Sequence, residues 1–419
     1  MDKNDYRPRI VDKKLKTLLS VFGGVLITGP KWCGKSWTAS SQAESEIFID
    51  IEENKKKAIL MPDVVLEGNN PRLIDEWQYA PLLWDAARRK IDEKHQPGMF
   101  LFTGSAVPPK DAPSHTGTGR FAKMRMRSLS LYETGDSSGK VSLTSLFDDE
   151  DFEPCMSEMD YMKALCLVCA GGWPAAFWVP EEHASLIARE YMNMVVNEDI
   201  NRVDGIKRDP ALVALFARSL ARNSATSVKA TSIKADIVER EGGDITEQTV
   251  RTYYEALKKL FVIEEQDAWA PSLRSRNRIR TTPKRHFTDP SLAAAVLGAT
   301  PKILSDDIKT AGFLFESLCF RDLSIYMDAL DGAVFHYHDY DELEVDTILQ
   351  LPDGRWAAAE VKLGTFEFDA AAENLRKLKK KLAKETVPPS FLAIVTASGG
   401  AAYKRDDGVY VVPLDCLKY

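Results

Sequence analysis

Short apolar runs that end in polar residues recur along the first third of the chain. Residues 24–28 (GVLIT), 72–75 (RLID) and 99–103 (MFLFT) are such runs, and a helix-compatible segment follows the first of them. Short apolar runs between turn signals are typical of strands in a parallel sheet that helices cover on both faces. The order of these segments predicts an α/β domain with a parallel sheet, whose ligands bind where the strands end.

The middle of the chain has the apolar spacing of helices. An acidic connector at 148–153 precedes a helical region from about 160 to 223, which we expect to form a helical lid. Residues 226–290 predict two helices followed by two strands. That order is typical of a winged helix.

The last 110 residues predict a second, smaller α/β domain. Residues 312–319 have the pattern of an amphipathic helix, and 343–351 and 355–362 read as two strands joined by a Pro-Asp-Gly turn. Residues 391–396 and 409–413 are expected to be the closing strands of this sheet.

Length and composition set the number of domains and the class of protein. A chain of 419 residues exceeds a single core, and we expect four domains, at 1–147, 148–225, 226–300 and 301–419. A content of 44% hydrophobic and 28% charged residues is that of an ordinary globular protein. Six cysteines in so long a chain predict reduced thiols.

Three further features concern location and partners. No apolar run approaches the roughly 18 residues that a membrane span needs, so we expect no membrane partner. The charged N-terminus lacks a signal-peptide apolar stretch, which predicts a cytoplasmic protein. The net charge of −7 argues against a protein coated with basic charge for nucleic acid, but it is compatible with a local basic patch.

The strongest motif follows the first apolar run. Gly29–Ser36 (GPKWCGKS) fits the phosphate-loop pattern G-x-x-x-x-G-K-[ST] at every fixed position. The glycines let backbone N–H groups wrap around phosphate oxygens, Lys35 bridges the β- and γ-phosphates, and the Ser36 hydroxyl binds Mg²⁺. The residues expected to contact ATP are Gly29, Pro30, Lys31, Trp32, Cys33, Gly34, Lys35, Ser36, Trp37 and Thr103.

Two adjacent acids, Asp75 and Glu76, end the second apolar run. We expect Asp75 in the Mg²⁺ shell and Glu76 as the base that orients and deprotonates the attacking water. Asp75 also precedes a helical stretch, so a helix N-cap is the alternative. Thr103 ends the third run, where its hydroxyl is a candidate sensor of the γ-phosphate or of that water.

Arg120 lies in an arginine-containing segment after the third run. One interpretation is an arginine finger that reaches the γ-phosphate of a neighbouring subunit, which would require a homo-oligomer. The other is a solvated arginine in a loop. The residue pattern leaves both open.

Together these segments resemble a large family of prokaryotic AAA-type ATPases. The resemblance implies an ATPase core followed by a C-terminal domain of unknown function with a restriction-endonuclease-like fold. Ser36 stands where threonine is common in that family, and the hydroxyl is kept. The resemblance rests on residues 29–36, 73–78, 101–105, 119–120, 129–133, 171–177 and 283–289.

The last domain carries the pattern E…D…E-x-K of that endonuclease-like fold. Asp346 and Glu360 are expected to hold Mg²⁺ or Mn²⁺, with Glu316 completing the site from its helix. Lys362 would then position or activate the water that attacks a phosphodiester. The alternative is a structural ion pair in a domain that only binds.

Two basic segments make DNA or RNA a candidate partner. Arg274, Arg276, Arg278 and Arg280 alternate along an extended segment, and residues 376–384 form a basic helix. Such residues also pair with acidic partners or form solvated faces. Our leading hypothesis is therefore an Mg²⁺-dependent ATPase that moves a nuclease-like module. The alternative is a nucleotide switch that scaffolds protein partners, with an inert C-terminal domain.

Overall fold

Two large sheets organise the chain, one in each of two units. The computed structural model describes residues 5–104, 117–241, 245–271 and 282–419. Unit 1 comprises residues 1–128, 197–207 and 255–262, and unit 2 comprises the remainder. Each unit is described by itself below.

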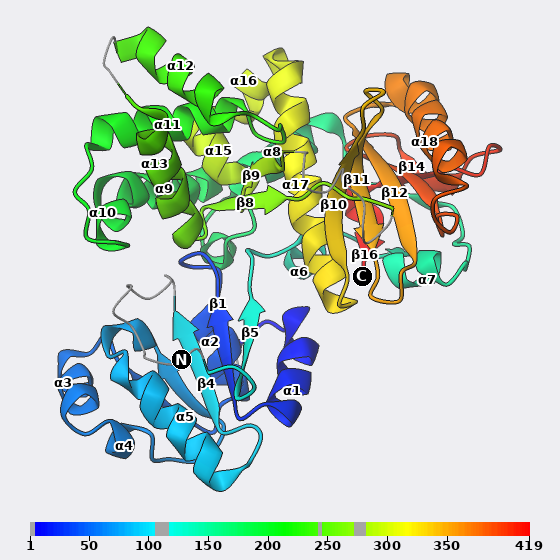
Figure 1. The fold of residues 1–419 in the computed structure, drawn as a ribbon. Coiled ribbons are helices and arrows are strands. Elements are labelled where there is room, and N and C mark those ends of the chain that lie inside the picture. Colours follow the sequence, from blue (N-terminus) through cyan, green and yellow to red (C-terminus); the bar gives the residue numbers. More distant parts are fainter. Residues whose placement is uncertain (1–4, 105–116, 242–244, 272–281) are drawn as a thin grey trace. The chain divides into compact units, whose positions relative to one another are not determined.

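The sheet of unit 1 has five strands in the order β2-β3-β4-β1-β5 (Figure 1). Every neighbouring pair is parallel, which confirms the parallel sheet expected from the sequence. The carboxyl ends of these strands therefore share one edge. The strands are β1 (Gly24–Thr28), β2 (Ser45–Phe48), β3 (Arg72–Asp75), β4 (Phe100–Gly104) and β5 (Phe121–Arg125).

Alternating side chains of the strands build a core on each face of this sheet. Val25 and Ile27 belong to one apolar cluster with residues of α1 and α2. Leu26, between them, belongs to a second cluster with residues of α3, α4 and α5. This period of two explains why the strand reads as a continuous apolar run. The helices are α1 (Val11–Val21), α2 (Lys35–Gln42), α3 (Glu52–Leu60), α4 (Pro62–Val65) and α5 (Leu82–Lys94), with a short η2 (Trp77–Tyr79).

The helices of unit 2 gather around α15 (Pro290–Leu297), which contacts α8, α9 and α11. Asp289 begins α15, and its carboxylate accepts hydrogen bonds from the backbone N–H groups of Ser291 and Gly172. Other helical elements of unit 2 are α6 (Leu131–Thr134), α7 (Leu143–Phe147), α8 (Tyr161–Ala170), η3 (Pro174–Trp178), η4 (Glu181–His183), α9 (Ala184–Met194), α11 (Pro210–Arg222) and α16 (Pro301–Asp306). A π-helical turn (Val195–Asp199) and α10 (Ile200–Arg202) follow α9.

The segment expected to be a winged helix has the order of elements that the sequence predicts. It runs α12 (Ala230–Glu241), α13 (Glu247–Lys259), β8 (Ile263–Gln266) and β9 (Lys284–Phe287). β8 and β9 pair as an antiparallel ribbon, with Ile263 opposite Phe287. The winged-helix assignment itself stays a prediction. The arginine series from Arg274 to Arg280 lies outside the described residues.

The C-terminal sheet has seven strands in the order β10-β11-β12-β13-β15-β14-β7. β10, β11 and β12 form an antiparallel meander, and β12, β13 and β15 are parallel. The strands are β7 (Cys155–Met156), β10 (Ala333–His338), β11 (Glu344–Gln350), β12 (Trp356–Lys362), β13 (Leu392–Thr396), β14 (Ala401–Lys404) and β15 (Tyr410–Pro413).

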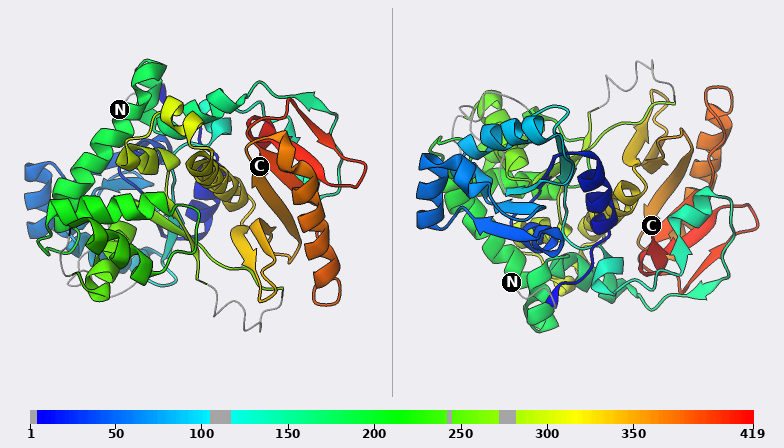
Figure 2. Two further views of the ribbon diagram at one scale, coloured as in Figure 1. Left: turned by 90° about the horizontal axis from the view of Figure 1, so that it is seen from above. Right: turned by 90° about the horizontal axis from the view of Figure 1, so that it is seen from below.

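Two long helices cover opposite faces of this sheet (Figure 2). Ile348, Ala358 and Ile394 belong to a cluster with the apolar face of α18 (Phe368–Leu382). Their neighbours Leu349 and Ala359 line an apolar hollow with Leu323 of α17 (Ile308–Ala329). The alternation places the two apolar clusters on the two faces.

Residues that follow the sheet of unit 1 form strand pairs with residues near the end of the chain. β6 (Val141–Ser142) is parallel to β16 (Leu417–Lys418), and β7 extends the edge of the C-terminal sheet through β14. The Asp415 carboxylate, in η7 (Leu414–Cys416), accepts backbone N–H groups of residues 158 and 159. These residues therefore belong with the C-terminal sheet, and the four domain limits stay predictions.

Among the described residues, none of the helices combines the length and the apolar character that crossing a membrane would need.

Candidate functional site

The loop after β1 has the backbone geometry of an anion cradle. Gly29 has φ 153° and Gly34 has φ 99°, a region that residues with a side chain rarely adopt. A Cβ on Gly29 would lie 2.3 Å from the carbonyl oxygen of Met126, so no larger residue fits. α2 begins at Lys35, directly after the loop. The positive end of its dipole and its first N–H groups therefore point toward the loop.

Two cationic side chains bind the carbonyl oxygens of this loop. The buried Lys35 ammonium donates to the carbonyl oxygen of Gly29 at 3.1 Å and to that of Pro30 at 2.7 Å. The buried Arg9 guanidinium donates to the carbonyl oxygen of Cys33 at 2.9 Å. Arg9 was not singled out from the sequence, because a lone arginine before the first helix carries no motif.

Asp75 lies at the carboxyl end of β3, beside the loop. Its Oδ1 accepts hydrogen bonds from the Ser36 hydroxyl, at 2.7 Å, and from the Thr103 hydroxyl. Side chains of α2, β3 and β4 therefore meet at this carboxylate. Burial raises the pKa of Asp75 above its ordinary value, against the effect of these two hydrogen bonds. Its side chain thus contacts hydroxyls of the loop and of β4 in this structure, and its role as a metal ligand stays a prediction.

Glu76 occupies a turn between β3 and η2. Its backbone is left-handed, with φ 54°, and its carboxylate accepts the side-chain amide of Gln78. Burial raises the pKa of Glu76, while the nearby Lys35 acts in the opposite direction. Glu76 stands at the N-cap position of η2 without a side-chain capping bond. The carboxylate is therefore oriented by Gln78.

The remaining loop residues differ in exposure. Lys31 forms an ion pair with Asp199, with 2.7 Å between Nζ and Oδ1. The Asp199 side chain is buried at 5% exposure, whereas that of Lys31 is 42% exposed. Trp32 is exposed, and Trp37 is half-buried on α2. The contact of Asp199 with the phosphate loop has no signal in the sequence, because 168 residues separate it from Lys31.

Arg120 lies at the opposite end of the sheet from this loop. It precedes β5, whose first residue is level with Gly24 at the start of β1. One strand of five residues, about 15 Å, separates that edge from the loop. Its Nε donates to the Asp92 carboxylate of α5 at 2.7 Å. A role of Arg120 in a neighbouring subunit's site stays a prediction.

The four side chains of the expected nuclease site come together in unit 2. Glu316 comes from α17, Asp346 from β11, and Glu360 and Lys362 from β12. The Lys362 Nζ lies 2.9 Å from Oε2 of Glu360 and 3.6 Å from Oδ2 of Asp346. The Asp346 carboxylate also accepts the backbone N–H of Val361 at 3.0 Å.

A second lysine, Lys284 of β9, enters the same cluster. Its Nζ lies 2.8 Å from Oε1 of Glu316 and 3.0 Å from Oε1 of Glu344. The distance to Oδ1 of Asp346 is 3.4 Å. Within the part of the chain that the structure describes, no group of three or more His, Cys, Asp or Glu side chains is arranged to hold a metal ion. Lys284 thus lies between Glu316, Glu344 and Asp346 in this structure, and the Mg²⁺ or Mn²⁺ expected there stays a prediction.

Burial and charge set the protonation of this cluster. Burial raises the pKa of Glu316 to about 8 and that of Glu360 to about 7, and the neighbouring Asp346 acts in the same direction. The pKa of Asp346 itself is lowered, because Lys284 and Lys362 outweigh the effect of its burial. Near neutral pH the two lysines therefore balance most of the remaining negative charge.

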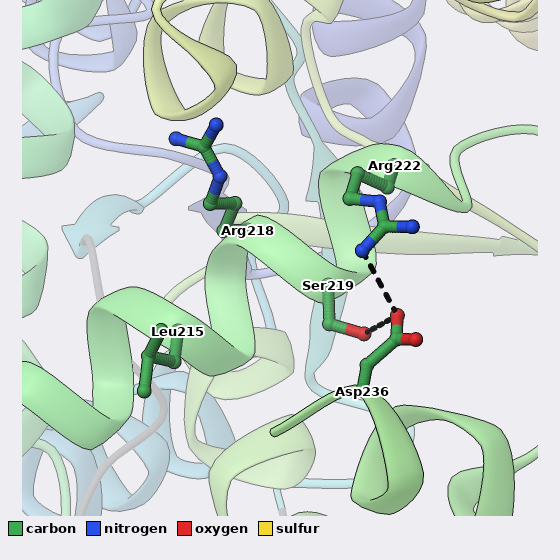
Figure 3. A pocket seen from close by; sticks show the side chains of 5 residues that line it. All are labelled: Leu215, Arg218, Ser219, Arg222 and Asp236. Atoms are coloured by element: carbon green, nitrogen blue, oxygen red, sulfur yellow. Dashed lines mark hydrogen bonds and ion pairs between the residues drawn. The ribbon is translucent and has the colours of Figure 1, made fainter. Parts of the chain in front are cut away.

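A smaller hollow lies between α11 and α12 (Figure 3). The Asp236 carboxylate accepts the Ser219 hydroxyl at 2.8 Å and lies 3.8 Å from a guanidinium nitrogen of Arg222. Arg218 points away from this group. The polar groups of the hollow thus bind one another.

Three family models match consecutive parts of the chain. Residues 22–135 match the AAA domain. Residues 164–303 match a domain of unknown function, DUF8612, and residues 311–417 match another, DUF4143. The first match confirms the AAA-type P-loop domain expected from the sequence. The third confirms a C-terminal domain of unknown function and leaves its endonuclease likeness a prediction.

Relatives and solved structures share low sequence identity with this chain, at 22% or less. The uncharacterized proteins Rv2008c of Mycobacterium tuberculosis and Mb2031c of Mycobacterium bovis are each 22% identical over 344 residues, covering 81% of this chain and 70% of theirs. A Walker-type ATPase of Pyrococcus abyssi is 14% identical with a TM-score of 0.44, covering 70% of this chain and 96% of that one. The ORC1 protein of Aeropyrum pernix in complex with DNA is 12% identical with a TM-score of 0.26, covering 70% and 94%.

Proposed function

We propose that this protein binds ATP at the loop Gly29–Ser36 and hydrolyses it with Mg²⁺. One observation carries the proposal. The Ser36 hydroxyl and the Asp75 carboxylate, from two elements of the sheet edge, meet at 2.7 Å beside the phosphate loop. A hydroxyl and a carboxylate are the hard oxygen ligands that Mg²⁺ takes beside nucleotide phosphates. The match of residues 22–135 to the AAA domain supports the same function.

The chemistry follows from the placement of three side chains. Lys35 holds loop carbonyl oxygens in this structure, and it exchanges them for phosphate oxygens when ATP binds. Ser36 and Asp75 would hold Mg²⁺, which neutralises charge on the phosphates. Thr103 orients Asp75 through its hydrogen bond.

Glu76 is the base in this proposal. Its carboxylate lies in a buried turn beside Asp75, where Gln78 orients it. A carboxylate with a raised pKa accepts a proton from water more readily than an exposed one. Glu76 therefore orients the attacking water and takes its proton, while Lys35 stabilises the charge on the transferred phosphoryl group.

We further propose that nucleic acid is the partner of unit 2. α18 buries Phe368, Leu375 and Leu378 and leaves its basic face in solvent. Lys379, Lys380 and Lys384 are exposed, and none of the three forms an ion pair with a residue that the structure describes. The order α12, α13, β8, β9 supports a winged helix. The β11–β12 pair with helices on both faces supports an endonuclease-like fold.

ATP turnover by the purified chain, with and without Mg²⁺, DNA and RNA, tests both proposals. We expect turnover only with Mg²⁺, because the phosphate charge is otherwise not neutralised. We also expect nucleic acid to change the rate. Absence of turnover under all conditions would contradict the ATPase proposal. A turnover rate that neither DNA nor RNA changes would favour the second candidate, a nucleotide switch for protein partners.

Two variants with the same change of net charge separate a specific surface from net charge. Replacing Lys379, Lys380 and Lys384 by Glu should weaken nucleic-acid binding and reduce the slope of log affinity against log salt by up to about 3. The control replaces three lysines of α3 by Glu. These are Lys55, Lys56 and Lys57. Equal losses in both variants would show that net charge alone is responsible.

The phosphate loop also contacts the segment 197–207 of unit 1. The buried Asp199 pairs with Lys31, and the chain on both sides of this segment continues in unit 2. We infer that ATP phosphates compete with Asp199 for the Lys31 ammonium. Nucleotide binding then releases a segment whose two ends connect to the other unit.

Asp199→Asn tests this competition. Removal of a negative charge beside the anion site should tighten ATP binding by about 2- to 5-fold, the range of a partly exposed ion pair. ATP titration followed by tryptophan fluorescence measures the change. Glu198→Gln, the neighbouring acid paired with Arg202, should leave the affinity unaltered. Weaker binding in Asp199→Asn would contradict the competition.

A further inference from the structure

Lys284 lies where a divalent cation of the C-terminal cluster would have to lie. Its ammonium contacts carboxylates of three different positions at 2.8, 3.0 and 3.4 Å. Two of these acids, Glu316 and Asp346, are the ones that the sequence pattern assigns to a metal. A metal ion would need such oxygens at about 2.0–2.6 Å around its own centre. One small volume cannot hold both cations.

Lys284 is buried and held by its strand. Its side chain is 4% exposed, so the positive charge is stable only because carboxylates surround it. Three carboxylates thus hold this one ammonium inside the cluster.

The ribbon that carries Lys284 is itself attached to the sheet and to α17. The Gln266 side-chain amide donates to the carbonyl oxygens of Phe335 and Asp346, both at 2.9 Å. His286 lies 3.0 Å from the Ser317 hydroxyl through Nδ1 and 3.1 Å from Gln266 Oε1 through Nε2. The strand that carries Lys284 is therefore fixed against the C-terminal sheet and α17.

We propose that Lys284 is the resident cation of the cluster formed by Glu316, Glu344 and Asp346, and that it excludes divalent metal from this domain. The cluster fastens the β8–β9 ribbon to the C-terminal sheet. A metal enters only after the Lys284 ammonium has left the cluster. The domain is thus closed to metal-dependent phosphodiester cleavage in this conformation, whether or not the ATP site is active.

Mn²⁺ binding to the nucleotide-free chain tests the proposal, with electron paramagnetic resonance as the readout. Wild type should show no Mn²⁺ site that depends on Asp346, so wild type and Asp346→Asn should titrate alike. Lys284→Met keeps the length of the side chain and removes its charge. This variant should gain about one Mn²⁺ per chain at pH 8, and Lys284→Met/Asp346→Asn should lose it again.

Two outcomes overturn the proposal. One is an Mn²⁺ site in wild type that Asp346→Asn removes. The other is a folded Lys284→Met chain, with an unchanged circular dichroism spectrum, that binds no additional Mn²⁺. If Lys284→Met does not fold, the comparison of wild type with Asp346→Asn still tests whether the wild-type cluster binds Mn²⁺. The absence of nucleotide separates these outcomes from Mg²⁺ or Mn²⁺ binding with ATP at the phosphate loop.

Discussion

Lys35→Ala should reduce ATP affinity by roughly 100-fold and abolish turnover, because a buried ammonium at a phosphate site makes charge-assisted hydrogen bonds worth about 1.5–3 kcal/mol. In the structure this ammonium already binds the carbonyl oxygens of Gly29 and Pro30. The alanine variant leaves those oxygens without this donor, so its folding must be checked by thermal unfolding. Equilibrium binding of labelled ATP and phosphate release measure the effect.

Lys56→Ala is the matched control, since Lys56 is exposed on α3 and its closest carboxylate is 3.9 Å away. This variant should bind and hydrolyse ATP as wild type does. Undiminished hydrolysis in Lys35→Ala would refute the assignment of Gly29–Ser36 as the ATP site. Equal losses in both variants would indicate a general effect of lysine removal.

Glu76→Gln should retain ATP and lower kcat by about 10²- to 10⁴-fold, the usual contribution of a positioned base. Glutamine keeps the size of the side chain and cannot accept the proton of the attacking water. Because burial raises the pKa of Glu76, the acid limb of the wild-type kcat profile should lie above the ordinary glutamate pKa of about 4.3. That limb should be absent from the residual activity of Glu76→Gln.

The measurement is a pH series of single-turnover rates at saturating ATP. Glu52→Gln serves as the control, because Glu52 is an exposed acid of α3 outside the site. A wild-type rate in Glu76→Gln would remove Glu76 from the mechanism. Loss of ATP binding in this variant would instead indicate a structural role for the carboxylate.

The nucleotide site is the part that sequence reasoning described most fully. Gly29 and Gly34 adopt the backbone angles that the motif requires, and Ser36 meets Asp75. Each of these residues follows a short apolar strand. Parallel strands bring their carboxyl ends to one edge, so the positions of the residues along the strands determine their proximity. The roles of Lys35 and Glu76 stay predictions until the two variants are measured.

The sequence predicted only part of the C-terminal cluster. Period-two alternation along β11 and β12 brings Asp346, Glu360 and Lys362 together, and these residues are close in sequence. Lys284 precedes Asp346 by 62 residues and belongs to another sheet. Its strand is a run of basic and apolar residues before a helix. That pattern contains no signal for a partner among distant carboxylates. Our proposal that this cluster excludes metal rests on this one side chain.

What the sequence by itself determined is therefore local: the strands that end in polar residues, the phosphate loop, the two acids at the end of β3, and the basic run that α18 carries. The tertiary structure alone decided the long-range pairs. Lys31 meets Asp199 across 168 residues, β6 pairs with β16, and Lys284 enters the cluster of Glu316. Backbone periodicity and turn geometry act over a few residues and can be read from a pattern. An ion pair between distant segments depends on how whole elements pack.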